Sequence, residues 1–186
     1  KFMNMELRDN KQIVLEAVTN NGYELEYASE ELRNDKDVVL AAVMNNGLVL
    51  LLASENLRNN KEVVLAAVIS DGNAIMYASE QLRGDKDVAL TAINNNAIAF
   101  AYLSEELRSD KDVVLVAVKK DGSSLNYISE ELKCDKEIVY LLKDFLIENK
   151  EDFISSYEAL VAYEREDELK QRLIEKENLS KSKIKI

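Results

Sequence analysis

The chain has 186 residues, of which 47% are apolar and 32% charged, and its net charge at neutral pH is −11. The apolar content is too high for a disordered chain, and the negative charge opposes binding to nucleic acid or to anionic membranes. Histidine is absent and Cys134 is the one cysteine, which argues against histidine-based catalysis, zinc or haem sites and an internal disulfide. No apolar run reaches the roughly 20 residues that span a bilayer, and the first ten residues lack the apolar core of a signal peptide. These features predict a soluble, cytoplasmic protein.

A 25-residue repeat begins at residue 10 and continues without insertion or deletion. Its register is marked by evenly spaced lysines: Lys11, Lys36, Lys61, Lys86, Lys111 and Lys136. We number the positions of each copy as slots 1 to 25, so that Asn10 and Asp35 occupy slot 1. Residues 1–9 match the last nine slots of a preceding partial copy, and residues 10–134 form five complete copies. Such a period indicates a solenoid, in which each copy buries its apolar face against its neighbours.

Each copy predicts a long helix followed by two shorter helical segments. Asp or Asn at slot 1 is a typical N-cap, and slots 4 to 9 are apolar almost all round, as in a helix enclosed by neighbours. Alanine at slot 8 allows adjacent helices to approach closely. We interpret the glycine at slot 13, replaced by Ala97 in the fourth copy, as a left-handed residue that ends the helix. A second helix is expected at slots 14 to 19, and serine at slot 20 is expected to cap a further turn.

The pattern changes after Asp135. A helix is expected to run on through residues 138–149, and residues 151–177 form a longer one with Phe153, Tyr157, Leu160 and Val161 on one face. We assign residues 135–178 to C-terminal capping helices and residues 179–186 to a disordered basic tail. The predicted fold is therefore all-α, a right-handed α-solenoid of five 25-residue repeats closed by a long C-terminal capping helix.

The string DKDVVLAAV, followed by glycine four residues later and then by YASEELR, resembles a family of short helical repeats known only as a domain of unknown function. The resemblance covers residues 1–143, with Ala97 and Leu52, which replaces the usual Tyr at slot 18, as departures. Such repeats occur in bacterial proteins, including secreted effectors, and in protist and giant-virus proteins. The resemblance implies a helical-repeat fold, carries no catalytic residues, and implies a host-cytoplasmic location if the chain belongs to an effector.

No group of residues predicts a catalytic, cofactor-binding or metal-binding site. Glutamate recurs at slot 21 of every copy, whereas a catalytic pair needs two carboxylates in different surroundings. We expect these glutamates to form ion-pair ladders with the Lys of slot 2 and the Arg or Lys of slot 24, the alternative being a lysine stripe for an anionic ligand. Cys134 occupies a linker slot, with a reactive thiol near Lys133 and Lys136 as the less favoured alternative.

Slots 14 and 17 differ most between otherwise similar copies. They lie three residues apart, on one face of the second helix. In the middle copies they hold the apolar residues Leu48, Leu51, Met76 and Ile98 together with Asn73 and Ala101, whereas the end copies have Tyr23, Glu26, Ser123 and Asn126. Because every copy has the same framework, the fold itself does not require apolar groups there. We predict that this stripe docks a partner; packing between repeats is the alternative.

Together these patterns predict a non-catalytic scaffold for protein–protein interaction, with no cofactor, metal, nucleic acid or membrane partner. The expected partner is a protein, and the stripe also offers a surface for weak self-association. The alternative is a structural spacer arm that positions a catalytic domain outside these residues.

Overall fold

The computed structural model describes the backbone of residues 5–183 and the side chains of residues 7–176. Over this range the chain is helical and without strands, as predicted. None of the helices described is both long enough and apolar enough to cross a membrane. Contacts divide the chain into two compact units, Lys1–Ile128 and Ser129–Ile186, which we describe separately.

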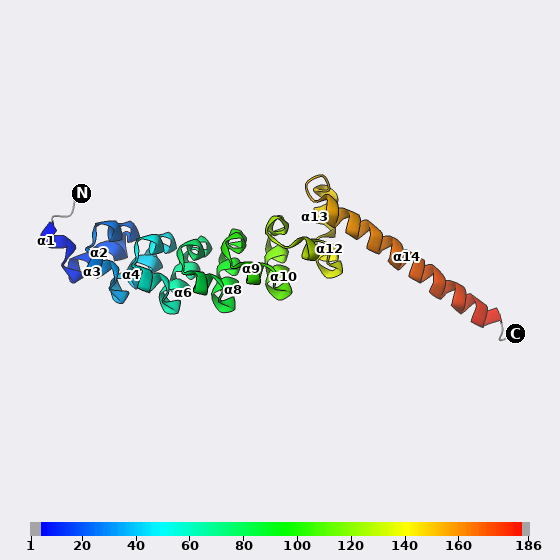
Figure 1. The fold of residues 1–186 in the computed structure, drawn as a ribbon, viewed down its shortest axis with the longest axis horizontal. Coiled ribbons are helices and arrows are strands. Elements are labelled where there is room, and N and C mark those ends of the chain that lie inside the picture. Colours follow the sequence, from blue (N-terminus) through cyan, green and yellow to red (C-terminus); the bar gives the residue numbers. More distant parts are fainter. Residues whose placement is uncertain (1–4, 184–186) are drawn as a thin grey trace. The chain divides into compact units, whose positions relative to one another are not determined.

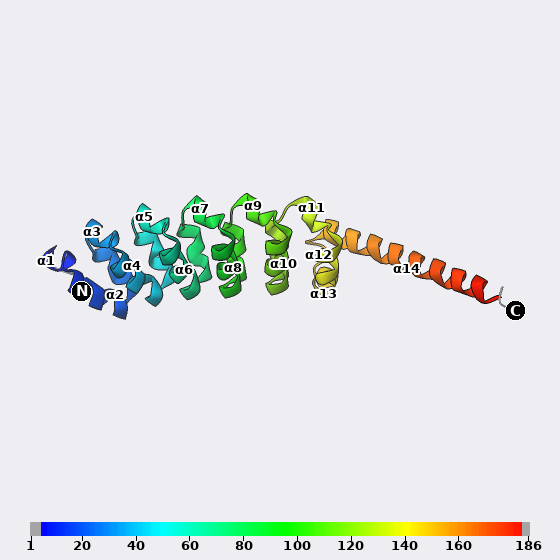
Figure 2. The same cartoon turned by 90° about the horizontal axis from the view of Figure 1, so that it is seen from below.

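Each copy folds as a ten-residue α-helix, a six-residue 3-10 helix and a four-residue α-helix. The long helices of the first unit are α2 (Lys11–Asn20), α4 (Lys36–Asn45), α6 (Lys61–Ser70), α8 (Lys86–Asn95) and α10 (Lys111–Lys120). The 3-10 helices are η1 (Gly22–Tyr27), η2 (Gly47–Leu52), η3 (Gly72–Tyr77), η4 (Ala97–Tyr102) and η5 (Gly122–Tyr127). The short α-helices are α1 (Met5–Arg8), α3 (Glu30–Arg33), α5 (Glu55–Arg58), α7 (Glu80–Arg83) and α9 (Glu105–Arg108). The long helices lie side by side in chain order (Figure 1), and α3, α5, α7 and α9 follow one edge of the stack (Figure 2).

Side-chain caps begin the helices where the sequence predicts them. Asn10 Oδ1 accepts the N–H groups of Gln12 and Ile13 at 3.1 and 3.2 Å and so starts the long helix. Ser29 Oγ accepts the N–H of Leu32 at 3.4 Å and starts the short one. These bonds satisfy N–H groups that lack an intrahelical partner, which is why slots 1 and 20 fix the helix starts.

The second helix differs from the prediction, because it is a 3-10 helix at slots 13 to 18 instead of an α-helix at slots 14 to 19. Asn21 Oδ1 accepts the N–H of Tyr23 at 3.2 Å, which starts the new helix immediately after the long one. With three residues per turn, slots three apart lie above one another. Slot 16 faces the core and is fully buried in every copy, at Leu25, Leu50, Ile75, Phe100 and Leu125.

Glycine at slot 13 has a different role from the predicted one. None of the described glycines has a positive φ, so a left-handed turn is not its function. A Cβ on Gly22, Gly47 or Gly72 would lie 2.7, 2.2 or 2.4 Å from the carbonyl oxygen of the slot-8 alanine in the next copy. That alanine is fully buried from the second copy to the fifth, as expected. Glycine and alanine together allow the close approach of successive copies.

Lysine ladders also join successive copies. Lys11 Nζ lies 2.8 Å from carboxylate oxygens of both Asp35 and Asp37. The acidic partners thus stand at slots 1 and 3 of the next copy, and the expected pairing of the slot-2 lysines with the slot-21 glutamates is wrong, because the slot-2 side chain reaches the start of the neighbouring long helix. A slot-24 residue does pair with a slot-21 glutamate at Lys133 and Glu130, 2.6 Å apart, but within one copy. The hydrogen bond from Lys86 outweighs burial and holds the pKa of Asp110 below its usual range. The lysines are exposed to solvent, which screens the charges, so each pair contributes little to stability.

Backbone hydrogen bonds repeat at the short helices. The N–H of a slot-20 serine donates to the carbonyl of the slot-24 arginine in the preceding copy. The donor and acceptor pairs are Ser29 with Arg8 at 3.2 Å, Ser54 with Arg33 at 3.0 Å, Ser79 with Arg58 at 2.9 Å and Ser104 with Arg83 at 3.1 Å.

The second unit consists of α11 (Glu130–Lys133), α12 (Lys136–Leu141), α13 (Lys143–Glu148) and α14 (Ile154–Lys183). The helix expected over residues 138–149 is interrupted at Leu142, where φ is −102° and ψ is 15°. Of the predicted face of the long helix, Leu160 is buried, and Phe153, Tyr157 and Val161 are partly buried.

The predicted disordered tail is helical for most of its length. Helix α14 continues through residues 179–183, where no glycine or proline interrupts it. Residues 184–186 of that tail, like residues 1–4 of the preceding partial copy, lie outside the described residues.

Candidate partner-binding surface

The predicted stripe lies on the outward edge of three 3-10 helices, η2, η3 and η4, which pack side by side. Leu51, Met76 and Ile98 are 44%, 39% and 55% exposed, and Leu48 is partly buried. Slots 14 and 17 lie above one another on a 3-10 helix, so these side chains line up on one edge. The structure therefore places all four predicted residues on a single face of the first unit.

Two further exposed apolar side chains belong to the same copies and were missed by the sequence analysis. Met44 and Ile69 are 70% and 65% exposed at slot 10, in the last turns of α4 and α6. Met44 and Leu48 flank the same turn between the long helix and the 3-10 helix. Slot 10 holds the polar residues Thr19, Asn94 and Lys119 in the other copies. The comparison between copies that singled out slots 14 and 17 also applies to this slot.

The row of 3-10 helices is almost uncharged. Helices η2, η3, η4 and η5 contain no Asp, Glu, Lys or Arg, although 32% of the chain is charged. Helix η1 differs, because it carries Glu24 and Glu26. Depletion of charged residues is typical of the centre of a protein interface. A partner could therefore bind this surface mainly through the hydrophobic effect, by burying its apolar side chains.

The described residues contain no group of three or more His, Cys, Asp or Glu side chains placed to hold a metal ion. Cys134 is partly buried, and its Sγ lies 3.8 Å from the carbonyl oxygen of Ser155. The carbonyl of Cys134 accepts the hydroxyl of Tyr163 at 3.0 Å. In the structure, then, Cys134 contributes to the contact between its linker and α14.

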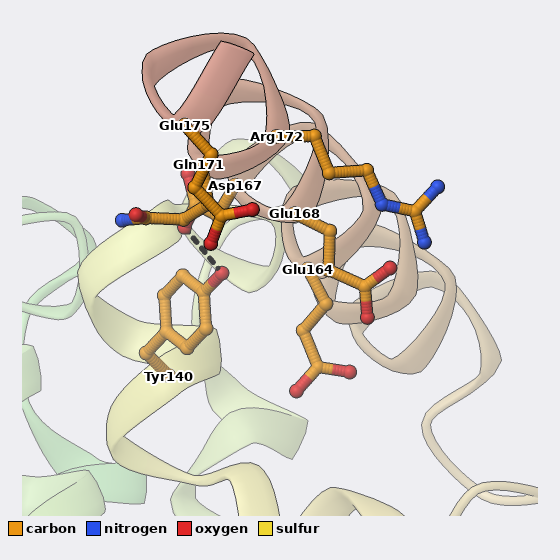
Figure 3. A pocket seen from close by; sticks show the side chains of 7 residues that line it. All are labelled: Tyr140, Glu164, Asp167, Glu168, Gln171, Arg172 and Glu175. Carbon is orange, nitrogen blue, oxygen red and sulfur yellow. Dashed lines mark hydrogen bonds between the residues drawn. The ribbon is translucent and has the colours of Figure 1, made fainter. Parts of the chain in front are cut away.

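A polar cluster connects α12 to α14 within the second unit. Lys136 Nζ donates to Asp167 Oδ1 at 2.9 Å and lies 5.5 Å from the ring centroids of both Tyr140 and Tyr163. The Tyr140 hydroxyl donates to Asp167 Oδ2 at 2.8 Å (Figure 3). In the repeats the slot-2 lysine binds an acidic residue of the next copy, and here α14 provides that residue. The sequence did not reveal this cluster, because Asp167 lies outside the repeat.

The cavity beside this cluster is lined mainly by acidic side chains of α14. Glu164, Glu168 and Glu175 line it together with Tyr140 and Asp167 (Figure 3). Hydrogen bonds from Lys136 and then Tyr140 lower the pKa of Asp167, so this carboxylate is ionised and already paired. The cluster thus has a structural role in docking α14.

The hydroxyl of Tyr140 is expected to ionise two pH units above an ordinary phenol. Its hydrogen bond to Asp167, followed by burial, raises its pKa from 10.0 to about 12. The neutral phenol is the form that donates, so the stabilisation is complete below pH 10 and is lost as the pH rises through about 12. Site-resolved NMR titration of the tyrosine ring carbons measures this value. Asp167→Asn should return it towards 10.0, and an unchanged titration would contradict the assigned bond.

The stacked copies define the chain as an α-helical solenoid of short repeats. The chain belongs to the family described as "Domain of unknown function (DUF4116)", whose profile matches residues 1–33, 10–58, 35–83, 60–108, 85–133 and 110–142. The four longest matches each span nearly two copies and start 25 residues apart, in step with the repeat. The predicted resemblance to a repeat family of unknown function is confirmed. No curated protein and no solved structure matches the chain.

Proposed function

We propose that the chain is a non-catalytic scaffold that binds a protein partner through the exposed apolar stripe Leu48, Leu51, Met76 and Ile98. The observation that carries the proposal is the concentration of exposed apolar side chains in the middle copies, on a row of uncharged 3-10 helices. Equivalent slots in the end copies are mostly polar, so the framework does not account for the apolar choice. Met44 and Ile69, near the ends of α4 and α6, add further exposed apolar area in the same copies.

The acidic character of the chain supports a protein as the partner. A net charge of −11 opposes approach to nucleic acid and to anionic lipid, for which phosphate contacts supply much of the affinity. The same charge disfavours strong self-association, leaving the stripe available to a different protein. A cytoplasmic location is part of this proposal.

Leu51→Glu is the substitution that tests the proposal. Burial of a leucine side chain at an interface contributes roughly 1.5–3 kcal/mol, so the dissociation constant should rise about ten-fold to 100-fold. Because Leu51 is 44% exposed in the free chain, the free energy of unfolding should change little. Partner capture with isotope-labelled lysate, followed by calorimetry with the purified partner, measures the loss of binding.

Asn126→Glu is the matched control, because it adds the same charge at the same exposed slot in the fifth copy. A partner retained by wild type and by this control but lost by Leu51→Glu supports the stripe. Equal binding by all three proteins would instead favour a spacer arm, in which the apolar surface has no partner. Unfolding of Leu51→Glu would place slot 17 in the core and would also contradict the proposal.

A further inference from the structure

The junctions between the first four copies share two features that the next junction lacks. The first is the glycine at slot 13, which lies against the backbone of the next long helix. A Cβ at Gly72 would lie 2.4 Å from Ala92 O and 2.9 Å from Asn96 N. Real Cβ atoms do not approach backbone atoms so closely, so this packing exists only with glycine.

The second feature is a side-chain bridge from slot 11 of the following copy. Asn95 Oδ1 accepts the N–H of Gly72 at 2.8 Å, while Asn95 Nδ2 donates to the carbonyl of Ile69 at 2.8 Å. Asn45 makes the same two bonds to Gly22 and Thr19, at 2.8 and 3.1 Å. At the second junction, Ser70 Oγ accepts the N–H of Gly47 at 3.1 Å. A side-chain acceptor at slot 11 thus fixes the start of each preceding 3-10 helix.

Both features are replaced at the junction between the fourth and fifth copies. Ala97 brings a Cβ to slot 13, and Lys120 stands at slot 11. A lysine ammonium has no acceptor, so it cannot bind the N–H of Ala97. Its Nζ donates to the carbonyl of Asn94, as Asn95 does to that of Ile69, so only the accepting half of the bridge is lost. Among the long helices of the first unit, α8 and α10 pack less closely than any other neighbouring pair (Figures 1 and 2).

We propose that the junction between the fourth and fifth copies is a joint. It opens before the other junctions of the first unit do. In a repeat array each copy contacts only its neighbours, so the interface that lacks the slot-11 acceptor and the close backbone approach is where opening begins. The joint lies immediately after the copies that carry Leu48, Leu51, Met76 and Ile98. The fifth copy therefore moves relative to a block that carries the stripe, with Ile98 of η4 directly beside the joint. The joint itself follows from the packing and does not depend on the proposed function.

Native-state hydrogen exchange on the full chain tests the joint by comparing equivalent amides in η3 and η4. We expect amides of η4 to be protected roughly ten-fold less than those of η3, which corresponds to a modest difference in opening free energy. The repair variant Ala97→Gly with Lys120→Asn should slow exchange in η4 to the η3 rate. Equal protection of η3 and η4 in the wild type, or a repair without effect, would overturn the proposal.

A transfer variant separates the joint from simple fraying near the end of the unit. Adding Gly72→Ala and Asn95→Lys to the repaired chain recreates the same residue pair one junction earlier. If the residue pair determines opening, the fast-exchanging boundary moves by 25 residues, from η4 to η3. A boundary that stays at η4 would show that position alone causes the exchange. If circular dichroism shows that the transfer variant does not fold, the repair variant decides, because it only adds contacts.

Discussion

Gly47→Ala is expected to lower the free energy of unfolding by about 1–3 kcal/mol, because the new methyl group has no room and must displace backbone. The Cβ would lie 2.2 Å from Ala67 O and 2.9 Å from Asp71 N, both in the next copy. Separation of the two copies would also lengthen the 3.1 Å hydrogen bond from Gly47 N–H to Ser70 Oγ. Urea denaturation followed by circular dichroism measures the change.

Gly84→Ala provides the control at a glycine of the same unit. Gly84 has φ −96° and ψ 0°, which alanine adopts without strain, and its nearest non-neighbour atom would lie 3.4 Å from the added Cβ. Alanine reduces the conformational entropy of the unfolded chain, so this variant should be unchanged or about 0.4–1 kcal/mol more stable. If Gly47→Ala and Gly84→Ala lowered the free energy of unfolding equally, the close approach at slot 13 would not be what sets the distance between copies.

Ala67→Leu is expected to cost on the order of 1–3 kcal/mol through overpacking. Ala67 is fully buried on α6. Its carbonyl oxygen accepts the N–H of Asp71 at 2.8 Å and is the atom nearest to the position of a Cβ on Gly47. A larger side chain at this fully buried position has no free space, so α6 must shift and lose packing against its neighbours. Thermal and urea unfolding should both report the loss.

Ala162→Leu makes the same chemical change at an exposed position of α14. Its stability should lie within about 0.5 kcal/mol of the wild type, as is usual for surface substitutions. A slot-8 variant as stable as this control would show that the long helices tolerate a wider spacing than the structure indicates.

The features that the sequence predicted correctly are those encoded by local chemistry. Caps at Asn10 and Ser29 depend on side chains that bond to backbone groups two or three residues away, so a single copy is enough to identify them. Burial of alanine at slot 8 follows from an apolar segment that recurs at every copy. The exposure of Leu51 and Ile98 agrees with the comparison of slots between copies, because residues that the framework does not need are free to vary.

The features that the sequence analysis got wrong depend on contacts between copies. A regular spacing of glycine fits a left-handed turn as well as a close approach, and only the backbone angles and the position of Ala67 O distinguish the two for Gly47. The partner of Lys11 depends on which residues of the next copy lie within its reach, and these are set by the stacking distance. The Lys136–Asp167 pair spans 31 residues and lies outside the periodic pattern, so no comparison between copies reveals it.

The bonds between copies allow the chain to gain or lose whole copies. Each lysine–carboxylate hydrogen bond within the ladder spans 24 or 26 residues, and each slot-11 bridge spans 23 or 26. Duplication of one 25-residue copy would therefore give every new donor an acceptor at the same separation and leave the existing pairs unchanged. A longer array would keep the same sequence separation between contacting residues, so its relative contact order would fall as copies are added. Length is thus a property that gene duplication can alter without redesign of any interface.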